Sequence, residues 1–147
     1  MPSTFGIIDL FAGPGGLGEG FASLTENGHA PFRIGISVEK ETSVHRTLRL
    51  RAFLREYGAR HGILPKEFID FHAGVVSEPN WSAVDAEAWQ HAIEEARALE
   101  LGTDAAATAI DAAIATLKRK YDDTILIGGP PCQAYSVVGV SAPEARS

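Results

Sequence analysis

Apolar residues near the start of the chain form first a short continuous run and then a spaced stripe. Residues 5–10 are mostly apolar, which predicts a buried strand. Residues 11–16 are rich in glycine and predict a tight turn. A helix is expected next, with Gly28 available to end it. Its apolar positions at helical spacing are Leu17, Phe21 and Leu24.

The same order of elements repeats in the next part of the chain. Residues 32–38 predict a second strand, which ends at Glu39. A helix is expected from Thr42 to about Tyr57, because apolar residues lie on one of its faces. The short apolar run at residues 68–71 predicts a third strand.

The segment 81–121 carries a helical pattern rich in alanine. Ser82 and Asp85 have the spacing of a capping box, and Gly102 is expected to end the first helix. A second helix is expected to begin at Thr103 or Asp104 and to finish in a basic run. We therefore expect an αα hairpin inserted before a last strand at residues 125–127.

Strands alternating with helices predict an α/β fold in a single domain of 147 residues. A hydrophobic content of 45% and a charged content of 22% are typical of a soluble globular protein. Neither a signal peptide nor a transmembrane run is recognisable in the sequence, so we expect a cytoplasmic protein. Residues 140–147 are expected to form a flexible tail.

Charge and metal-ligating residues restrict the possible functions. A net charge of −6 argues against binding of nucleic acid by charge alone. A single cysteine cannot form an internal disulfide, which is consistent with a reducing compartment. The five histidines show no paired ligand spacing, so no metal site is predicted.

The glycine-rich turn is a candidate nucleotide-binding element. Gly13, Gly15 and Gly18 satisfy the pattern G-x-G-x-x-G between a strand and a helix, where backbone N–H groups approach a ligand closely. Glu39 follows Gly18 by about 20 residues, the usual place for an acid that binds ribose hydroxyls. The alternatives are a simple strand-to-helix turn and a solvated glutamate at the start of the next helix.

Cys132 is the candidate nucleophile. It follows the expected strand 125–127 through a stiff loop, Gly-Gly-Pro-Pro, at residues 128–131. This order places the thiol at the carboxyl end of a strand, where open α/β sheets bind their ligands. The alternative is that a lone cysteine is a small buried hydrophobic residue.

Two stretches together resemble one protein family. Residues 9–16, Asp-Leu-Phe-Ala-Gly-Pro-Gly-Gly, and residues 129–136, Gly-Pro-Pro-Cys-Gln-Ala-Tyr-Ser, are similar to the cofactor and catalytic motifs of the DNA (cytosine-5)-methyltransferases. The resemblance covers the amino-terminal part of that catalytic domain. It implies an incomplete Rossmann-like methyltransferase sheet with flanking helices, S-adenosylmethionine as cofactor and double-stranded DNA with a flipped cytosine as substrate.

The resemblance also assigns roles to individual residues. Cys132 would be the nucleophile, and Phe11 and Glu39 would contact the adenine and the ribose of the cofactor. Pro131, Gln133 and Ser136 are expected to contact the substrate. The full set expected at the cofactor is Asp9, Phe11, Ala12, Gly13, Gly15, Gly16, Leu17, Glu39, Lys40, Gly129 and Pro131.

The sequence departs from the family pattern in two respects. The family has an acid after its third strand that binds adenine, but the turn expected at residues 73–76 has Val75 at this position, so Asp70 or Glu78 is expected to substitute. The family motifs that activate the cytosine and read the DNA have no counterpart here, so a complementing C-terminal methyltransferase chain is expected. The alternatives are a truncated, non-catalytic remnant that binds only cofactor or a partner, and an NAD-binding oxidoreductase that uses the same turn.

Overall fold

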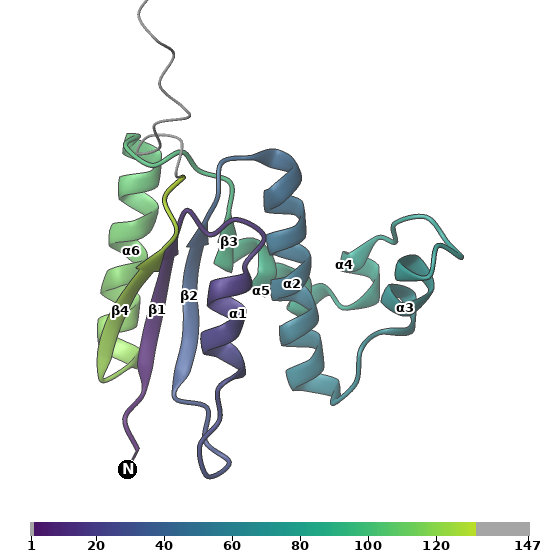
Figure 1. Cartoon of the computed structure of the whole chain (residues 1–147), viewed down its shortest axis with the longest axis horizontal. Coiled ribbons are helices and arrows are strands. Elements are labelled where there is room, and N and C mark those ends of the chain that lie inside the picture. The colour runs from purple at the N-terminus through teal and green to yellow at the C-terminus, as the bar shows by residue number, and fades with distance from the viewer. Residues whose placement is uncertain (1, 132–147) are drawn as a thin grey trace, which may run out of the picture.

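A computed structural model describes residues 2–131 and contains a four-stranded parallel sheet in the order β3-β2-β1-β4. Helix α1 packs on one face of the sheet and helix α6 on the other (Figure 1). This arrangement confirms the predicted α/β class and is compatible with a Rossmann-like methyltransferase fold. The elements are β1 (Phe5–Leu10), α1 (Gly16–Ser23), β2 (Phe32–Val38), α2 (Thr42–His61), α3 (Lys66–His72), α4 (Trp81–Val84), α5 (Ala86–Glu95), β3 (Ala96–Arg97), α6 (Asp104–Lys120) and β4 (Asp123–Gly128).

Strands β1 and β2 lie where the apolar runs predicted them. They pair in parallel from Phe5 beside Phe32 to Leu10 beside Val38, with one register shift that leaves Gly35 without a partner on β1. Strand β1 carries successive buried residues, as a parallel strand covered on both faces requires, whereas the polar residues Arg33 and Ser37 interrupt the apolar run of β2.

Strand β4 pairs in parallel with β1 over its whole length, from Asp123 beside Phe5 to Gly128 beside Leu10. It includes the predicted strand 125–127 and extends beyond it at both ends. A Cβ atom on Gly128 would lie 2.4 Å from the backbone oxygen of Leu10, so only glycine fits at this crossing. The loop after β4 therefore begins beside the loop after β1.

Helix α6 closes the second face of the sheet. Its buried residue Leu117 packs on β1 and β2, where a Cβ atom on Gly6 or Gly35 would lie 2.8 or 2.5 Å from its side chain. The two glycines thus allow helix and sheet to approach closely. Ile8, Ile36 and Val38 are buried in the same cluster with Leu117.

Two helix ends differ from the prediction. Helix α1 ends at Ser23, and Gly28 instead belongs to a turn between Glu26 and His29. Helix α2 continues past Tyr57 to His61 and ends at Gly62, which adopts φ 75°. A left-handed residue after the last turn is the usual helix end, and Gly62 meets that requirement without strain.

The predicted strand at residues 68–71 is wrong, because this run belongs to helix α3. Phe68 and Phe71 pack against Trp81 of α4, with ring centroids 6.5 and 6.0 Å apart. An apolar run of four residues fits one turn of a helix as well as a strand, so only these tertiary contacts decide the structure.

The predicted hairpin at 81–121 is also wrong, because the short strand β3 separates α5 from α6 and pairs with Ser37 and Val38 of β2. The first long helix of the segment ends at Glu95, not at Gly102. Asp85 does not complete a capping box with Ser82, because it is itself the cap of α5 and accepts a hydrogen bond from Ala88 N at 3.0 Å. The segment is therefore part of the sheet.

In the described part of the chain, no helix is both long and apolar enough to cross a membrane.

Candidate functional site

The loops that follow the four strands gather at the carboxyl edge of the sheet, at the top of Figure 1. Parallel α/β sheets bind ligands at this edge, because helix amino ends and loop backbone groups converge there. Most of the predicted cofactor residues lie in these loops. The fold therefore brings together the glycine turn after β1, the acid after β2 and the loop after β4.

The turn after β1 has the backbone geometry of a ligand-binding loop. Phe11, Gly13 and Gly15 adopt positive φ angles of 54°, 58° and 93°. Ala12 N donates to Val38 O at 3.0 Å, which fixes the turn to the end of β2. A Cβ atom on Gly13 or Gly16 would meet nothing within 4 Å, so the outer side of the turn is open to a ligand.

Glu39 holds this turn with its carboxylate. Its Oε2 accepts a hydrogen bond from Gly13 N at 2.9 Å, and its Oε1 accepts one from Glu41 N at 2.8 Å. Its own backbone N–H donates to Arg97 O at 3.1 Å, so the end of β3 holds it in turn. Each carboxylate oxygen can accept a second hydrogen bond, which leaves Glu39 able to bind hydroxyl groups.

Three other predicted side chains point outward at this edge. Phe11 and Leu17 are 43% and 50% exposed, so their side chains are accessible to a ligand at this edge. Lys40 is exposed and lies 3.6 Å from a carboxylate oxygen of Glu100 in the loop after β3. Sequence reasoning missed Glu100, because the two-residue strand before it has no recognisable pattern.

Strand β3 is held from the α2 side by a buried histidine. His45 Nε2 lies 2.9 Å from Ala96 O, and since a carbonyl only accepts, Nε2 is the donor. Asp70 and Glu78 do not lie in the loop after this strand. Asp70 pairs with Lys66 within α3, and Glu78 pairs with Arg46. Val75 likewise follows α3, so the expected turn at 73–76 is not the turn after the third strand.

Asp9 lies beneath the turn, where a ligand on the open side cannot reach its side chain. It is 1% exposed and lies beside Ser37 on the α1 face of the sheet. Burial raises the pKa of this carboxyl to about 6, and the charge of Glu95 adds to the effect, while the backbone N–H of Gly18 opposes it. Among the described residues, neither of its oxygens has a hydrogen-bond partner of normal geometry.

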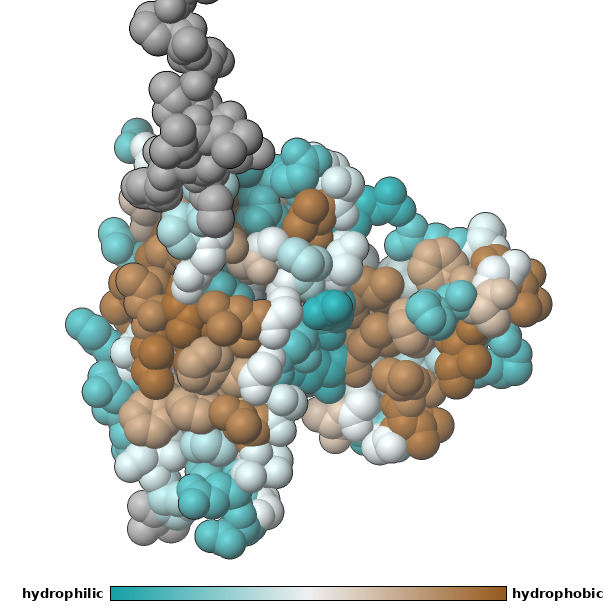
Figure 2. Space-filling model, in the orientation of Figure 1, coloured by the Kyte–Doolittle hydropathy of each residue, from teal (hydrophilic) through white to brown (hydrophobic). Residues whose placement is uncertain are grey.

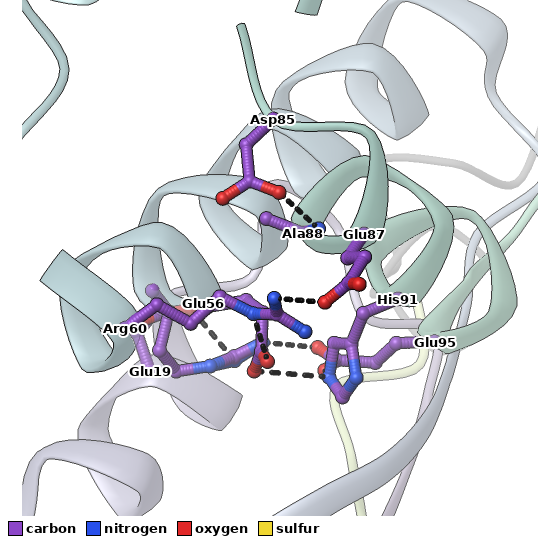
Figure 3. A network of polar contacts seen from close by, with 9 residues as sticks. Glu19, Glu56, Arg60, Asp85, Glu87, Ala88, His91 and Glu95 are labelled. Atoms are coloured by element: carbon purple, nitrogen blue, oxygen red, sulfur yellow. Dashed lines mark hydrogen bonds and ion pairs between the residues drawn. The ribbon is translucent and has the colours of Figure 1, made fainter. Parts of the chain in front are cut away.

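A network of charged residues ties α1, α2 and α5 together on the same face (Figure 3). Arg55 pairs with Glu19 at 3.0 Å and with the buried carboxylate of Glu95. His91 lies 3.2 Å from Glu95, whose hydrogen bond raises the pKa of the histidine. Burial raises the pKa of Glu19. Within residues 2–131, no group of three potential ligands could hold a metal ion.

The predicted nucleophile, Cys132, lies outside the described residues, as do Gln133 and Ser136. Gly129 and Pro131 are described and exposed, directly after β4. Both residues therefore follow β4, which lies beside β1. Strand β1 in turn leads into the glycine turn. The roles of these residues stay predictions.

The chain is similar to the type II methyltransferase M.Bpa9945I of Bacillus paralicheniformis, with 31% identity over 154 residues. The similarity covers 92% of this chain but only 32% of that protein, so the chain spans about a third of the length of its relative. No family model and no solved structure matches the chain. The similarity supports a methyltransferase and favours this class over an NAD-binding oxidoreductase.

Proposed function

We propose that this chain is the cofactor-binding and nucleophile-bearing part of a DNA cytosine-5 methyltransferase that acts together with a complementing polypeptide. The observation that carries the proposal is the 2.9 Å hydrogen bond between Gly13 N and Glu39, which joins the glycine turn and the acid into one site. The similarity to a methyltransferase supports the reaction class. The two sequence motifs favour cytosine C5 as the acceptor.

The residues at the carboxyl edge fit S-adenosylmethionine. The open side of the turn at Gly13 and Gly16 leaves room for the methionine portion, and its backbone N–H groups suit a carboxylate. The exposed ring of Phe11 suits stacking on adenine. The free lone pairs of Glu39 suit the ribose hydroxyls. Glu100, the first carboxylate after β3, replaces Asp70 and Glu78 as the acid we expect to contact the adenine amino group.

The proposed chemistry follows from the weak nucleophilicity of cytosine C5. The Cys132 thiolate adds to C6, forming a carbon–sulfur bond and moving electron density to C5. When bound, S-adenosylmethionine would supply an electrophilic methyl group to C5, and the broken sulfur–methyl bond would leave S-adenosylhomocysteine as the second product. Loss of the C5 proton to a base then releases the thiolate and restores the aromatic ring. The stiff Pro130–Pro131 segment would hold the thiol in one position against the flipped base.

The outer edge of β4 supports the presence of a further part of the methyltransferase beside it. Among the described elements, β4 pairs only with β1, and its other edge has no strand partner. Leu126 on this strand is 65% exposed, and Figure 2 shows a hydrophobic surface over β4 and β1. An exposed apolar edge strand favours pairing with another strand. The occupant we infer is the remaining part of the methyltransferase, since two thirds of the relative has no counterpart in the match.

Covalent trapping tests the proposal. DNA containing 5-fluorocytosine has no proton to lose at C5, so the adduct with the thiol should persist. The chain is mixed with S-adenosylmethionine, this DNA and the part of the Bacillus relative outside the matched region. Mass spectrometry should then show an adduct at Cys132 that Cys132→Ser abolishes.

Calorimetry with the chain alone separates the cofactor assignment from the catalytic one. We expect binding of S-adenosylmethionine and none of NAD. Cofactor binding without an adduct, in a mixture where the intact relative is trapped, would identify a non-catalytic remnant. Binding of NAD alone would overturn the cofactor assignment.

A further inference from the structure

The lower half of β2 has an open edge on the side opposite β1. Strand β3 pairs only with Ser37 and Val38. The preceding residues, Phe32–Ile36, have no strand partner on that side within the described chain. A strand edge of this length exposes backbone donors and acceptors to any chain that can lie alongside.

The hydrogen bonds to β1 show which groups face this edge. Phe5 N donates to Pro31 O at 2.8 Å, so Pro31 directs its backbone toward β1. Residues of a parallel strand direct their N–H and C=O groups alternately to the two sides. Phe32 and Ile34 therefore present their backbone groups to the open edge.

A cavity of about 890 Å³ lies along this edge. It is lined by β2, by α6 and by the charged side chains of α2 and α5. The α6 wall consists largely of small residues, with Ala109, Ala112 and Ala113 leaving room between helix and strand edge. The space is therefore a trough between the edge of β2 and the helices around it.

The two walls of the trough differ in charge. On the α2 and α5 wall, Glu56 and Glu95 are in ion pairs with cationic groups (Figure 3), and Glu94 accepts a hydrogen bond from Gln90. On the other side, Arg33, Arg97 and Lys120 line the cavity, and none of them is in an ion pair with another described residue.

The unpaired cations lie on the same side as α6. Arg33 is the register partner of Gly6, and Arg97 is the register partner of Val38. Gly6 lies against Leu117 of α6, and Val38 belongs to the same core cluster as Leu117. Side chains of paired residues in a parallel sheet point to the same face. The trough thus has a positive wall on its α6 side.

We propose that this trough binds an acidic, extended segment of a partner protein, which adds to β2 as a strand in line with β3. Phe32 and Ile34 supply the backbone hydrogen bonds. Alternate side chains of the segment point toward α6, where carboxylates meet Arg33, Arg97 and Lys120. This inference does not depend on the proposed function, because the trough lies along the strand edge and not at the carboxyl ends of the strands.

The probe is a synthetic seven-residue peptide in which aspartate alternates with valine, labelled for fluorescence anisotropy. Its matched control is the same peptide N-methylated at alternate residues, which keeps the charge but removes the backbone donors. We expect the unmodified peptide to bind and N-methylation to weaken binding by at least about tenfold. Hydrogen exchange should slow at Phe32 and Ile34 when the unmodified peptide is added.

Charge reversal gives an independent readout. Arg33→Glu and Lys120→Glu should each weaken peptide binding by at least about fivefold. Lys118→Glu, on the same helix but outside the trough, is the matched control and should leave binding unchanged. Thermal melting of each variant shows whether the fold is intact, and Lys120 is exposed, so its replacement keeps the fold testable.

Three results would overturn the proposal. Equal binding of the N-methylated peptide would show simple charge attraction. A second contrary result is that, in the absence of peptide, hydrogen exchange at Phe32 and Ile34 slows as the protein concentration rises. That result would show self-association at this edge. Displacement of the peptide by a short DNA duplex, with loss of binding in the same charge-reversed variants, would make the trough a nucleic-acid surface.

Discussion

The two edges of the sheet differ. At one edge β4 runs for six residues and exposes the apolar side chain of Leu126. At the other edge β3 pairs with only two residues of β2. The β4 edge continues a hydrophobic surface over β1 (Figure 2). The β2 edge opens into a trough with a positive wall formed by Arg33, Arg97 and Lys120. Among residues 2–131, neither edge has a further strand partner, but the two edges differ in what surrounds them.

The difference indicates two kinds of association. An apolar edge favours a large, permanent interface, because the stability of such an interface comes from area removed from water. A short edge inside a charged trough favours a small and reversible one, because its free energy comes from a few backbone bonds and salt-sensitive ion pairs. The β4 edge therefore suits the remainder of an enzyme, and the β2 edge suits a short segment of a partner.

The largest expected effect follows from Leu126→Arg. Burying this charge at the β4 edge without a partner should reduce methylation by the assembled enzyme by more than about 100-fold. Stability of the chain alone should change by less than about 0.5 kcal/mol, because Leu126 is exposed. Arg33→Glu is the control and should leave assembly intact. Equal losses in both variants would remove the distinction between the edges.

The variant Gly35→Ala tests how closely α6 packs on β2, the strand at the opposite edge, at the position of its register shift. The new methyl group would lie 2.5 Å from the Leu117 side chain, which is buried and cannot move freely. Overpacking of this kind should lower the free energy of unfolding by about 2–3 kcal/mol. Gly20→Ala meets nothing within 4 Å in helix α1 and should not destabilise the chain. Urea unfolding measures both, and similar midpoints for the two variants would contradict the close packing of α6.

Asp9 lies on β1, between the two edges of the sheet. Its replacement should change the free energy of unfolding without changing association at either edge. Its folded pKa of about 6 exceeds the ordinary value of 3.8, so folding favours the protonated form. The free energy of unfolding should therefore fall as pH rises from about 4 to 6, and Asp9→Asn should remove this fall. At pH 7 the variant should be more stable by about 3 kcal/mol, and the difference should vanish below pH 4. A flat difference between unfolding curves across this range would refute the raised pKa.

The smallest expected effect concerns the loops that follow the strands at the carboxyl edge of the sheet. Glu39→Gln should weaken S-adenosylmethionine binding by about tenfold, since an amide oxygen replaces the carboxylate toward Gly13 and the ribose. Glu100→Gln should have a smaller effect, because Glu100 is exposed and its one ion pair, with Lys40, spans 3.6 Å. Calorimetry checks both, with Glu26→Gln in an exposed turn as the control. A larger loss for Glu100 than for Glu39 would reverse the assigned roles.

The elements that the sequence predicted correctly have long or well-bounded patterns. The runs at β1 and β2 and the capped, seventeen-residue α6 belong to this class. Strand β3 could not be predicted, because two residues carry no periodicity and their pairing with Ser37 and Val38 is decided by tertiary structure. The same limit explains the wrong strand at Phe68, where packing on Trp81 selects a helix.

The site was predictable to a similar degree. The sequence assigned Gly13 and Glu39 to the same cofactor site, and the structure brings them together, with Gly13 N donating to Glu39 Oε2 at 2.9 Å. Their contacts with a cofactor stay predictions. The burial of Asp9 was not predictable, because the sequence does not show which face of the sheet a residue within a strand will point to, or what covers that face. Glu100 was missed together with β3, since an acid after a strand is recognisable only when the strand is.

Arg97 belongs to both functional regions, because its backbone oxygen accepts the N–H of Glu39 while its side chain lines the trough. A bound peptide that displaced Arg97 would act on the backbone of Glu39, whose carboxylate holds the glycine turn. Thermodynamic linkage then requires the two ligands to change each other's affinity by the same factor. The two-residue strand β3 is therefore the element through which the two proposed sites would be coupled.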